Sequence, residues 1–170
     1  MIRSTLLQLV RDRRGTAAAE MALVAPLLII ILFGSIEVGT FFLDQHTLEK
    51  AVRDGARFAA RQGFSNYTAC SGSPGGTVVA DTKNVVMYGY LSGSTVLTPH
   101  ITTPDITVST SCATTAGGQT MSGLYKNHAG GAQIVTVTAA VPFTPLLAPF
   151  GLNAGAWQMN ATSQASVTGL

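Results

Sequence analysis

The hydrophobic pattern of the first third of the chain begins with a continuous apolar run. Sixteen uncharged residues separate Glu20 from Glu37, and apolar residues at 17–19 and 38–43 extend the run on both sides. A helix that crosses the hydrocarbon core of a bilayer needs about 20 residues. The run therefore spans a membrane only if one or both glutamates lie near an interface or are paired. Pro26 does not exclude a membrane helix, because neighbouring groups can satisfy the carbonyl that proline leaves without a donor.

Beyond this run the pattern becomes amphipathic without a break. Apolar residues recur in steps of seven, four, four and three along one helical face, namely Phe41, Leu48, Val52, Ala56 and Ala59. Charged residues occupy the opposite face, namely Glu49, Lys50, Arg53, Asp54, Arg57 and Arg61. The two patterns together predict one helix from about Ala17 to Arg61, roughly 68 Å long with about 30 Å in lipid. Its apolar stripe needs a cover, which either the chain's own C-terminal domain or other subunits in a filament core can provide.

The rest of the chain carries shorter elements between loop signals. Gly63 and the Ser71–Gly76 cluster mark the end of the long helix and a loop. A short helix is predicted from Val78 to about Tyr88. Alternating or β-branched residues predict three strands, at Asp105–Cys112, Gln133–Val141 and Ala156–Thr168.

Two further stretches favour loops. Ala113–Gly131 is rich in glycine and threonine, and Pro142–Gly151 carries too many prolines for a central strand. The predicted fold is α+β, with a long N-terminal helix packed against a small antiparallel sheet of about three strands. We expect a basic leader at 1–15, the long helix at 16–62 with its first half in the membrane, and an α+β domain at 63–170.

The charge distribution predicts how the chain sits in a membrane. Arg3, Arg11, Arg13 and Arg14 precede the apolar run, offset only by Asp12. The positive-inside rule keeps such an N-terminus cytoplasmic and sends the chain after Leu43 across the membrane. A cleaved secretory signal peptide is the competing interpretation. The residues at 34–39 match its small-residue cleavage site poorly, so we expect the segment to remain in the protein.

Composition narrows the function classes. Only 11% of the 170 residues are charged, against about 25% in an ordinary soluble chain, and the net charge of +2 predicts no attraction to nucleic acid. Few charges follow Phe64, which suggests that partner subunits cover part of the surface. His46, His100 and His128 show no metal-binding or catalytic spacing. We therefore expect no enzyme, no cofactor and no metal site.

The two cysteines, Cys70 and Cys112, both follow the apolar run. If this part of the chain faces an oxidising compartment, an even pair indicates a disulfide. Closing a loop of about 40 residues stabilises a fold by roughly 4 kcal/mol in the chain-entropy model. Two free buried thiols are the alternative.

Gly15 and Glu20 form the most informative local pattern. Gly15 follows the basic leader, and Glu20 stands five residues later at the start of the apolar run. A carboxylate in mid-bilayer is unfavourable by about 2.5–3.5 kcal/mol on insertion scales, and by less near the interface. One interpretation is that the leader is removed after Gly15 and that Glu20 then meets a cation in a helical assembly. The other is that Glu20 lies at the headgroup level, where the positive end of the helix dipole stabilises it by about 0.3–1 kcal/mol.

The chain resembles a known family over about Arg11–Arg61. The similarity is carried by RRGTAAAEMALVAPLL at 13–28, FGSIEVG at 33–39 and AVRDGAR at 51–57. These segments resemble the TadE-like pseudopilins, or minor pilins, of the tight-adherence (Flp/Tad) pilus system. The NVVMYG stretch at 84–89, and VPF and PLL at 141–147, are similar to later and looser parts of that family.

The resemblance implies a specific biology. A prepilin peptidase would cleave between Gly15 and Thr16, and Glu20 would pair with the terminal amine of a neighbouring subunit during assembly. The major Flp pilins are much shorter and carry tyrosine where this chain has Met21, so the minor role is favoured. The implied partners are the lipid bilayer, the peptidase, other pilin or pseudopilin subunits and the assembly machinery. The implied location is the bacterial inner membrane, with a single pass and a periplasmic C-terminal domain.

A membrane-anchored adhesin is the alternative function. Its Thr- and Gly-rich loops at Ser71–Gly76 and Ala113–Gly131 could contact a surface, although nothing in them names a ligand. Incorporation into the extracellular pilus and retention in the membrane both remain open from the sequence.

Overall fold

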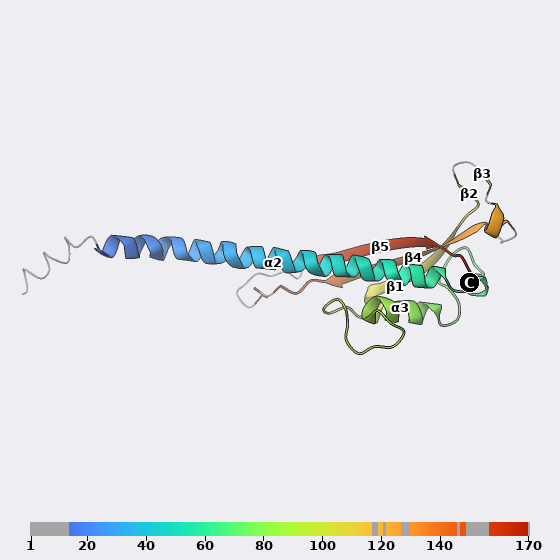
Figure 1. Cartoon of the computed structure of the whole chain (residues 1–170), viewed down its shortest axis with the longest axis horizontal. Coiled ribbons are helices and arrows are strands. Elements are labelled where there is room, and N and C mark those ends of the chain that lie inside the picture. Colours follow the sequence, from blue (N-terminus) through green and yellow to red (C-terminus); the bar gives the residue numbers. More distant parts are fainter. Residues whose placement is uncertain are drawn as a thin grey trace, which may run out of the picture. The chain divides into compact units, whose positions relative to one another are not determined.

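The computed structural model describes residues 14–116, 119–120, 122–126, 130–145, 147–148 and 157–169. The chain divides into two compact units, an N-terminal unit at Met1–Thr40 and a C-terminal unit at Phe41–Leu170. Figure 1 follows the elements along the sequence from blue to red. Residues 1–13 of the leader predicted at 1–15 lie outside the described residues.

Helix α2 runs from Arg14 to Ala60 as one continuous element. It confirms the long helix predicted from the apolar run and the amphipathic stripe. Pro26 lies inside the helix and does not end it. The carbonyl of Ala60, at the C-terminal end of the helix, receives a hydrogen bond from a residue far away in sequence. The backbone N–H of Thr168 donates to it at 2.8 Å.

Helix α3 covers Val78–Tyr88, as predicted. It ends at Gly89, whose φ of 82° lies in the left-handed region that glycine adopts readily. The N–H of Gly89 donates to the carbonyl of Val85 at 2.8 Å, which closes the last turn. Three short 3₁₀ turns complete the helical elements among the described residues, at Phe64–Asn66, Thr103–Asp105 and Gly123–Tyr125.

The main sheet has three antiparallel strands in the order β1-β4-β5. They are β1 at Ile106–Ala113, β4 at Ala132–Pro142 and β5 at Gln158–Ser166. Val137 of β4 lies opposite Val108 of β1 and Ser163 of β5. The α+β fold and the three predicted strands are thus confirmed.

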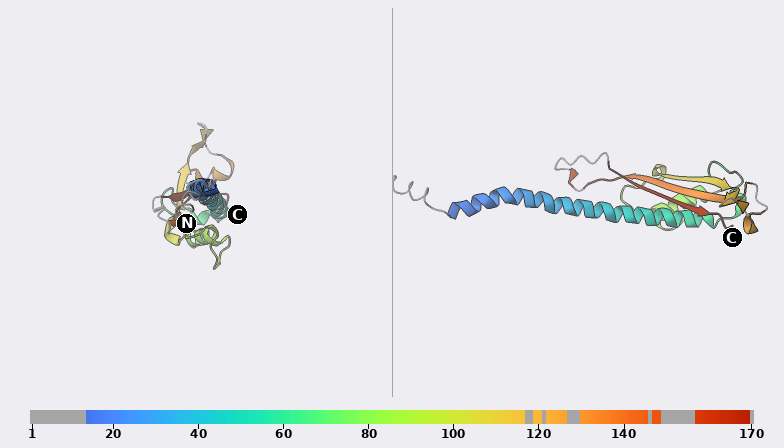
Figure 2. Two further views of the ribbon diagram at one scale, coloured as in Figure 1. Left: turned by 90° about the vertical axis from the view of Figure 1, so that its left-hand side faces the viewer. Right: turned by 90° about the horizontal axis from the view of Figure 1, so that it is seen from above.

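The core of the C-terminal unit lies between the sheet and the second half of α2. Val135, Val137, Ala139 and Val141 alternate along β4 and are fully buried. The predicted helical stripe meets them, with Leu48, Val52, Ala56 and Ala59 all at 0% exposure. Figures 1 and 2 show the strands running alongside this part of α2 from two directions. Between residues 48 and 60 the domain's own sheet therefore covers the stripe.

Helix α3 packs on α2 at a close approach. A Cβ atom at Gly55 of α2 would lie 2.4 Å from Cγ2 of Val86. Such a distance is below any normal van der Waals contact, so only glycine fits there without displacing α3. Val86 itself is fully buried in the same core.

The stretch Ala113–Gly131 differs from the expected loop. It contains a two-stranded hairpin, β2 at Thr115–Ala116 and β3 at Gln119–Thr120. Strands this short carry too little periodicity to be predicted from the sequence. The predicted connection at Pro142–Gly151 lies partly outside the described residues, and its described part after Pro142 contains no strand.

Candidate functional site

The first half of α2 exposes its apolar side chains on all sides. Twelve large apolar side chains between residues 21 and 38 are each at least 46% exposed, namely Met21, Leu23, Val24, Leu27, Leu28, Ile29, Ile30, Ile31, Leu32, Phe33, Ile36 and Val38. A helix that is hydrophobic all round is stable in lipid or in a protein core, but not in water. The helix Gly15–Ala60 is long and apolar enough to cross a membrane.

Gly15 and Thr16 lie within the first described turn of α2. A Cβ atom built on Gly15 would meet nothing within 4 Å. Packing within the described residues therefore does not require glycine at this position. A peptidase needs access to the peptide bond, and a helical segment that makes few packing contacts opens locally more easily than one in a core.

Glu20 follows Thr16 by four residues, so both lie on one helical face about 6 Å apart along the axis. The Glu20 side chain is exposed among apolar neighbours. The structure therefore places the backbone nitrogen of Thr16 and the side chain of Glu20 about one helical turn apart on the same face of α2.

Glu37 behaves differently from Glu20. It is the only charged residue between Glu20 and Phe41, and it is 4% exposed. Its carboxylate is thus shielded from the surroundings of the helix.

Comparison with known proteins points to the same segment. Residues 15–57 match the model of the TadE-like protein family. The match confirms the resemblance seen in the sequence, and it covers the exposed apolar half of α2 together with most of the stripe. Neither the curated proteins nor the solved structures gave a match to the chain.

The TadE-like match supports a membrane-anchored protein associated with the Tad pilus, in the general role of a minor pilin. It supports a structural component of the pilus. Of the three histidines weighed for catalysis, His46 lies on α2 with Nδ1 3.9 Å from Glu49, and His100 lies in the loop before β1. His128 lies outside the described residues.

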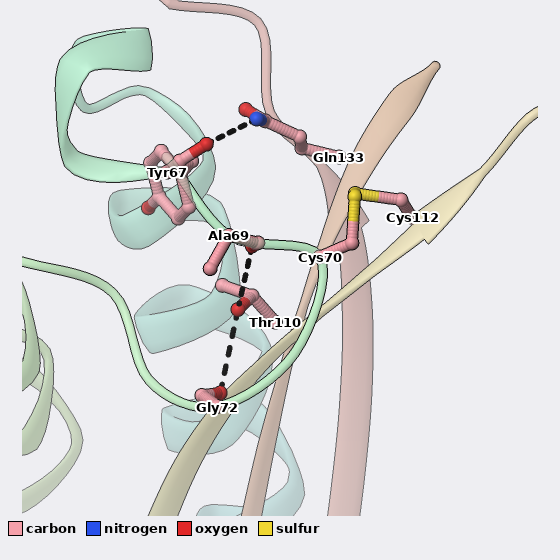
Figure 3. The surroundings of a disulfide bond; sticks show 7 residues. All are labelled: Tyr67, Ala69, Cys70, Gly72, Thr110, Cys112 and Gln133. Atoms are coloured by element: carbon pink, nitrogen blue, oxygen red, sulfur yellow. Dashed lines mark hydrogen bonds between the residues drawn. A yellow bond between two sulfur atoms is a disulfide. The ribbon is translucent and has the colours of Figure 1, made fainter. Parts of the chain in front are cut away.

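Beyond the TadE-like segment, Tyr67 connects the end of α2 to the sheet through two hydrogen bonds. Its hydroxyl donates to the carbonyl of Ala59 in the last turn of the helix. Its own carbonyl accepts from Nε2 of Gln133 on β4, as Figure 3 shows. The side chain is 1% exposed, and this burial raises the pKa of Tyr67 to about 12. The sequence carried no periodic signal for this residue, because its partners are distant in the chain.

Cys70 and Cys112 are joined by a disulfide, with their Cα atoms 5.0 Å apart and a sequence separation of 42. The bond ties the loop after α2 to the end of β1 (Figure 3). A second connection lies beside it, where the N–H of Thr110 donates to the carbonyl of Gly72 at 2.8 Å. The predicted loop at Ser71–Gly76 is therefore fixed to the sheet at this point.

Gly130 packs directly against the disulfide. Its φ of 89° lies in the left-handed region, and a Cβ atom there would lie 2.2 Å from Sγ of Cys70. Both the backbone conformation and the space therefore require glycine. The disulfide, Gly130 and Tyr67 together hold the end of the C-terminal unit at which α2 finishes.

Proposed function

We propose that this chain is a minor pilin, or pseudopilin, which is processed by a prepilin peptidase and takes part in assembling a Tad-type pilus. The observation that carries the proposal is the exposed apolar half of α2, which coincides with the TadE-like match. Residues 21–36 supply a surface that lipid can surround before assembly and that other apolar helices can cover after it.

Burial within the C-terminal unit limits which face of α2 can contact other subunits. The stripe from Leu48 to Ala59 is already covered by the domain's own sheet. Helix bundling with other pilin subunits is therefore left to the segment before Phe41. The opposite face of α2, from Glu49 onward, remains charged and exposed.

Processing between Gly15 and Thr16 would place a new amine at the start of this segment. An amine and a carboxylate are each unfavourable alone in a low-dielectric medium and attract strongly when paired. Glu20 lies one turn from that amine on the same subunit. In an assembly with staggered helices, the amine of one subunit reaches the Glu20 of its neighbour, so that the pair sets the register between subunits.

The orientation of the chain follows from the leader. Arginines at 3, 11, 13 and 14 favour a cytoplasmic N-terminus in the bacterial inner membrane. The C-terminal unit would then face the periplasm, an oxidising compartment in which the Cys70–Cys112 disulfide is stable. The partners of this protein would be the bilayer, the peptidase, neighbouring pilin subunits and the assembly machinery.

The experiment replaces Glu20 by Gln in a host with its own peptidase and pilus system. We expect the variant to insert in the membrane and to start at Thr16 by mass spectrometry, but to reduce piliation by at least tenfold, because the loss of one charged pair in a low-dielectric site exceeds about 1.4 kcal/mol.

The matched control is Glu49→Gln, which removes an exposed carboxylate from the water-facing part of the same helix. It should leave piliation unchanged. Normal piliation in the Glu20→Gln strain would refute the pairing, and a mature chain that keeps its arginines would refute the processing step.

The adhesin alternative gains no support among the described residues. The Ser71–Gly76 loop is held against β1 and Asn66 by backbone hydrogen bonds, with Gly75 N–H donating to the carbonyl of Asn66 at 2.7 Å. The Ala113–Gly131 stretch is described only in part.

A further inference from the structure

Four aromatic side chains gather at one end of the C-terminal unit. The ring of Phe41 meets Phe143 edge-on with centroids 5.1 Å apart, and it meets Trp157 in the same manner at 6.0 Å. Phe143 and Trp157 stack at 6.3 Å, and Phe42 lies edge-on to Phe41 at 6.0 Å. We call Phe41, Phe42, Phe143 and Trp157 the aromatic cluster.

The sheet itself holds the cluster together. Phe143 directly follows β4, and Trp157 directly precedes β5. The N–H of Phe143 donates to the carbonyl of Trp157 at 2.9 Å, which continues the pairing of the two strands by one step. The disulfide lies at the other end of this sheet, where Cys112 of β1 pairs with Gln133 near the start of β4.

The cluster is only partly covered by the protein. Phe143 is 6% exposed, whereas Trp157 is 48% and Phe42 is 56% exposed, and the adjacent Leu43 is 69% exposed. Phe143 and the partly buried Phe41 anchor the group in the core, and the other two present large apolar faces outward. A domain that worked in water on every side would gain nothing from exposing these rings.

The position of the cluster along α2 indicates what covers it. Phe41 follows Glu20 by 21 residues, which corresponds to about 31 Å of helix. The hydrocarbon core of a bilayer is about 30 Å thick. When Glu20 lies at one face of the membrane, Phe41 on the same helix lies at the other.

The chemistry of the cluster fits that position. Tryptophan is enriched at membrane–water interfaces, because its ring is largely apolar while its indole N–H donates a hydrogen bond. Along α2, Asp44 is the first ionisable residue after Phe42, and burial raises the pKa of its carboxyl above the ordinary value. The first lysine or arginine after Phe42 is Lys50. The cluster is therefore suited to the uncharged upper acyl and carbonyl layer rather than to the phosphates.

We propose that the aromatic cluster seats the membrane-facing end of the C-terminal unit in the outer interfacial layer of the lipid bilayer. This inference rests on the membrane insertion in the proposed function. The rings of Trp157 and Phe42 enter the interface, and Phe41 and Phe143 connect them rigidly to the sheet. The C-terminal unit is thereby held at a fixed height on the membrane before the subunit joins an assembly.

The test uses the fluorescence of Trp157, which is the only tryptophan in the chain. The full chain is reconstituted in phosphatidylcholine vesicles that contain lipids brominated either near the top or near the end of the acyl chain. We expect the bromines near the top to quench most of the emission and the bromines near the end to quench much less.

The control moves the tryptophan to the other end of the unit, in a Trp157→Phe/Leu124→Trp variant. Leu124 is 56% exposed, and its neighbour Tyr125 donates from its hydroxyl to the carbonyl of Val167 beyond the end of β5. Its emission should be unaffected by either brominated lipid. Circular dichroism verifies that the variant keeps the fold.

The outcomes separate this inference from the proposed function. If the chain stays in the vesicles on carbonate extraction but the bromines do not quench Trp157, the membrane-spanning helix is supported. The proposed contact between the aromatic cluster and lipid is then overturned. Extraction of the chain into solution overturns the membrane insertion itself. Shielding of Trp157 only within assembled pili would identify the cluster as a contact between subunits, which also overturns the contact with lipid.

Discussion

Tyr67 shows how a single side chain connects distant parts of this fold. Its hydroxyl satisfies a carbonyl in the last turn of α2, and its backbone carbonyl accepts from Gln133 on β4. The four last carbonyls of any helix lack partners within the helix. Tyr67 supplies one such partner from a fully buried position, and its protonation state therefore matters for stability.

Raising the pH above about 10 should destabilise the C-terminal unit through this residue. Burial raises the pKa of Tyr67 from 10.0 to about 12, so the folded protein holds the hydroxyl proton more tightly than the unfolded chain. The stabilisation is complete below the unfolded pKa and is lost as the pH rises towards the folded pKa. The difference corresponds to about 2.7 kcal/mol at most, because one pKa unit is about 1.4 kcal/mol.

Denaturant unfolding of the full chain in mild detergent, followed by circular dichroism at a series of pH values, measures this loss. Tyr67→Phe is the control, since it removes the titrating hydroxyl together with its hydrogen bond. The variant should be less stable by about 1 kcal/mol near neutral pH and should decline less steeply between about pH 10 and 12. An equally steep decline in the variant would show that other groups cause the alkaline loss.

At the scale of elements, one helix serves two environments. α2 exposes apolar side chains on all sides in its first half and buries a narrow stripe in its second half. Both halves could be predicted, because a continuous apolar run and a 3.6-residue period are local signals. The three main strands were predictable for the same reason, since alternation in β4 matches its burial.

Other features could not be predicted, because they depend on contacts between residues far apart in sequence. The period of the stripe shows that it is buried, but not that its own sheet covers it. The burial of Glu37, the position of Tyr67 and the aromatic cluster carry no local signature either. The β2–β3 hairpin has strands of only two residues, which is too short for any pattern.

The disulfide, which joins the loop after α2 to β1, should raise the free energy of unfolding of the C-terminal unit. Cys70 and Cys112 are 42 residues apart, and closing a loop of that size stabilises a fold by up to about 4 kcal/mol. The Cys70→Ser/Cys112→Ser variant should therefore unfold at lower denaturant concentration than the oxidised protein.

The wild-type chain treated with reductant is the matched comparison, and it should unfold at nearly the same denaturant concentration as the serine variant. Mass spectrometry with a thiol-alkylating reagent verifies the redox state of each sample. A reduced chain that is as stable as the oxidised chain would show that the bond does not constrain this unit.

At the scale of the whole molecule, the core belongs to one unit only. Every residue of the buried core cluster lies at position 48 or later, whereas the large apolar side chains of the N-terminal unit are exposed. The C-terminal unit should therefore fold without residues 1–40, because none of its core contacts are removed. The N-terminal unit depends instead on lipid or on other subunits for its stability.

A chain that begins at Phe41 tests this division. When exported to the periplasm so that its disulfide can form, it should be soluble without detergent and show the circular dichroism of an α+β fold with a cooperative thermal transition. The full chain, compared under identical conditions, should require detergent, because twelve large apolar side chains between residues 21 and 38 remain exposed. A shortened chain that aggregates or lacks a cooperative transition would show that the C-terminal unit depends on the membrane segment for folding. A full chain that is soluble without detergent would contradict the membrane anchor.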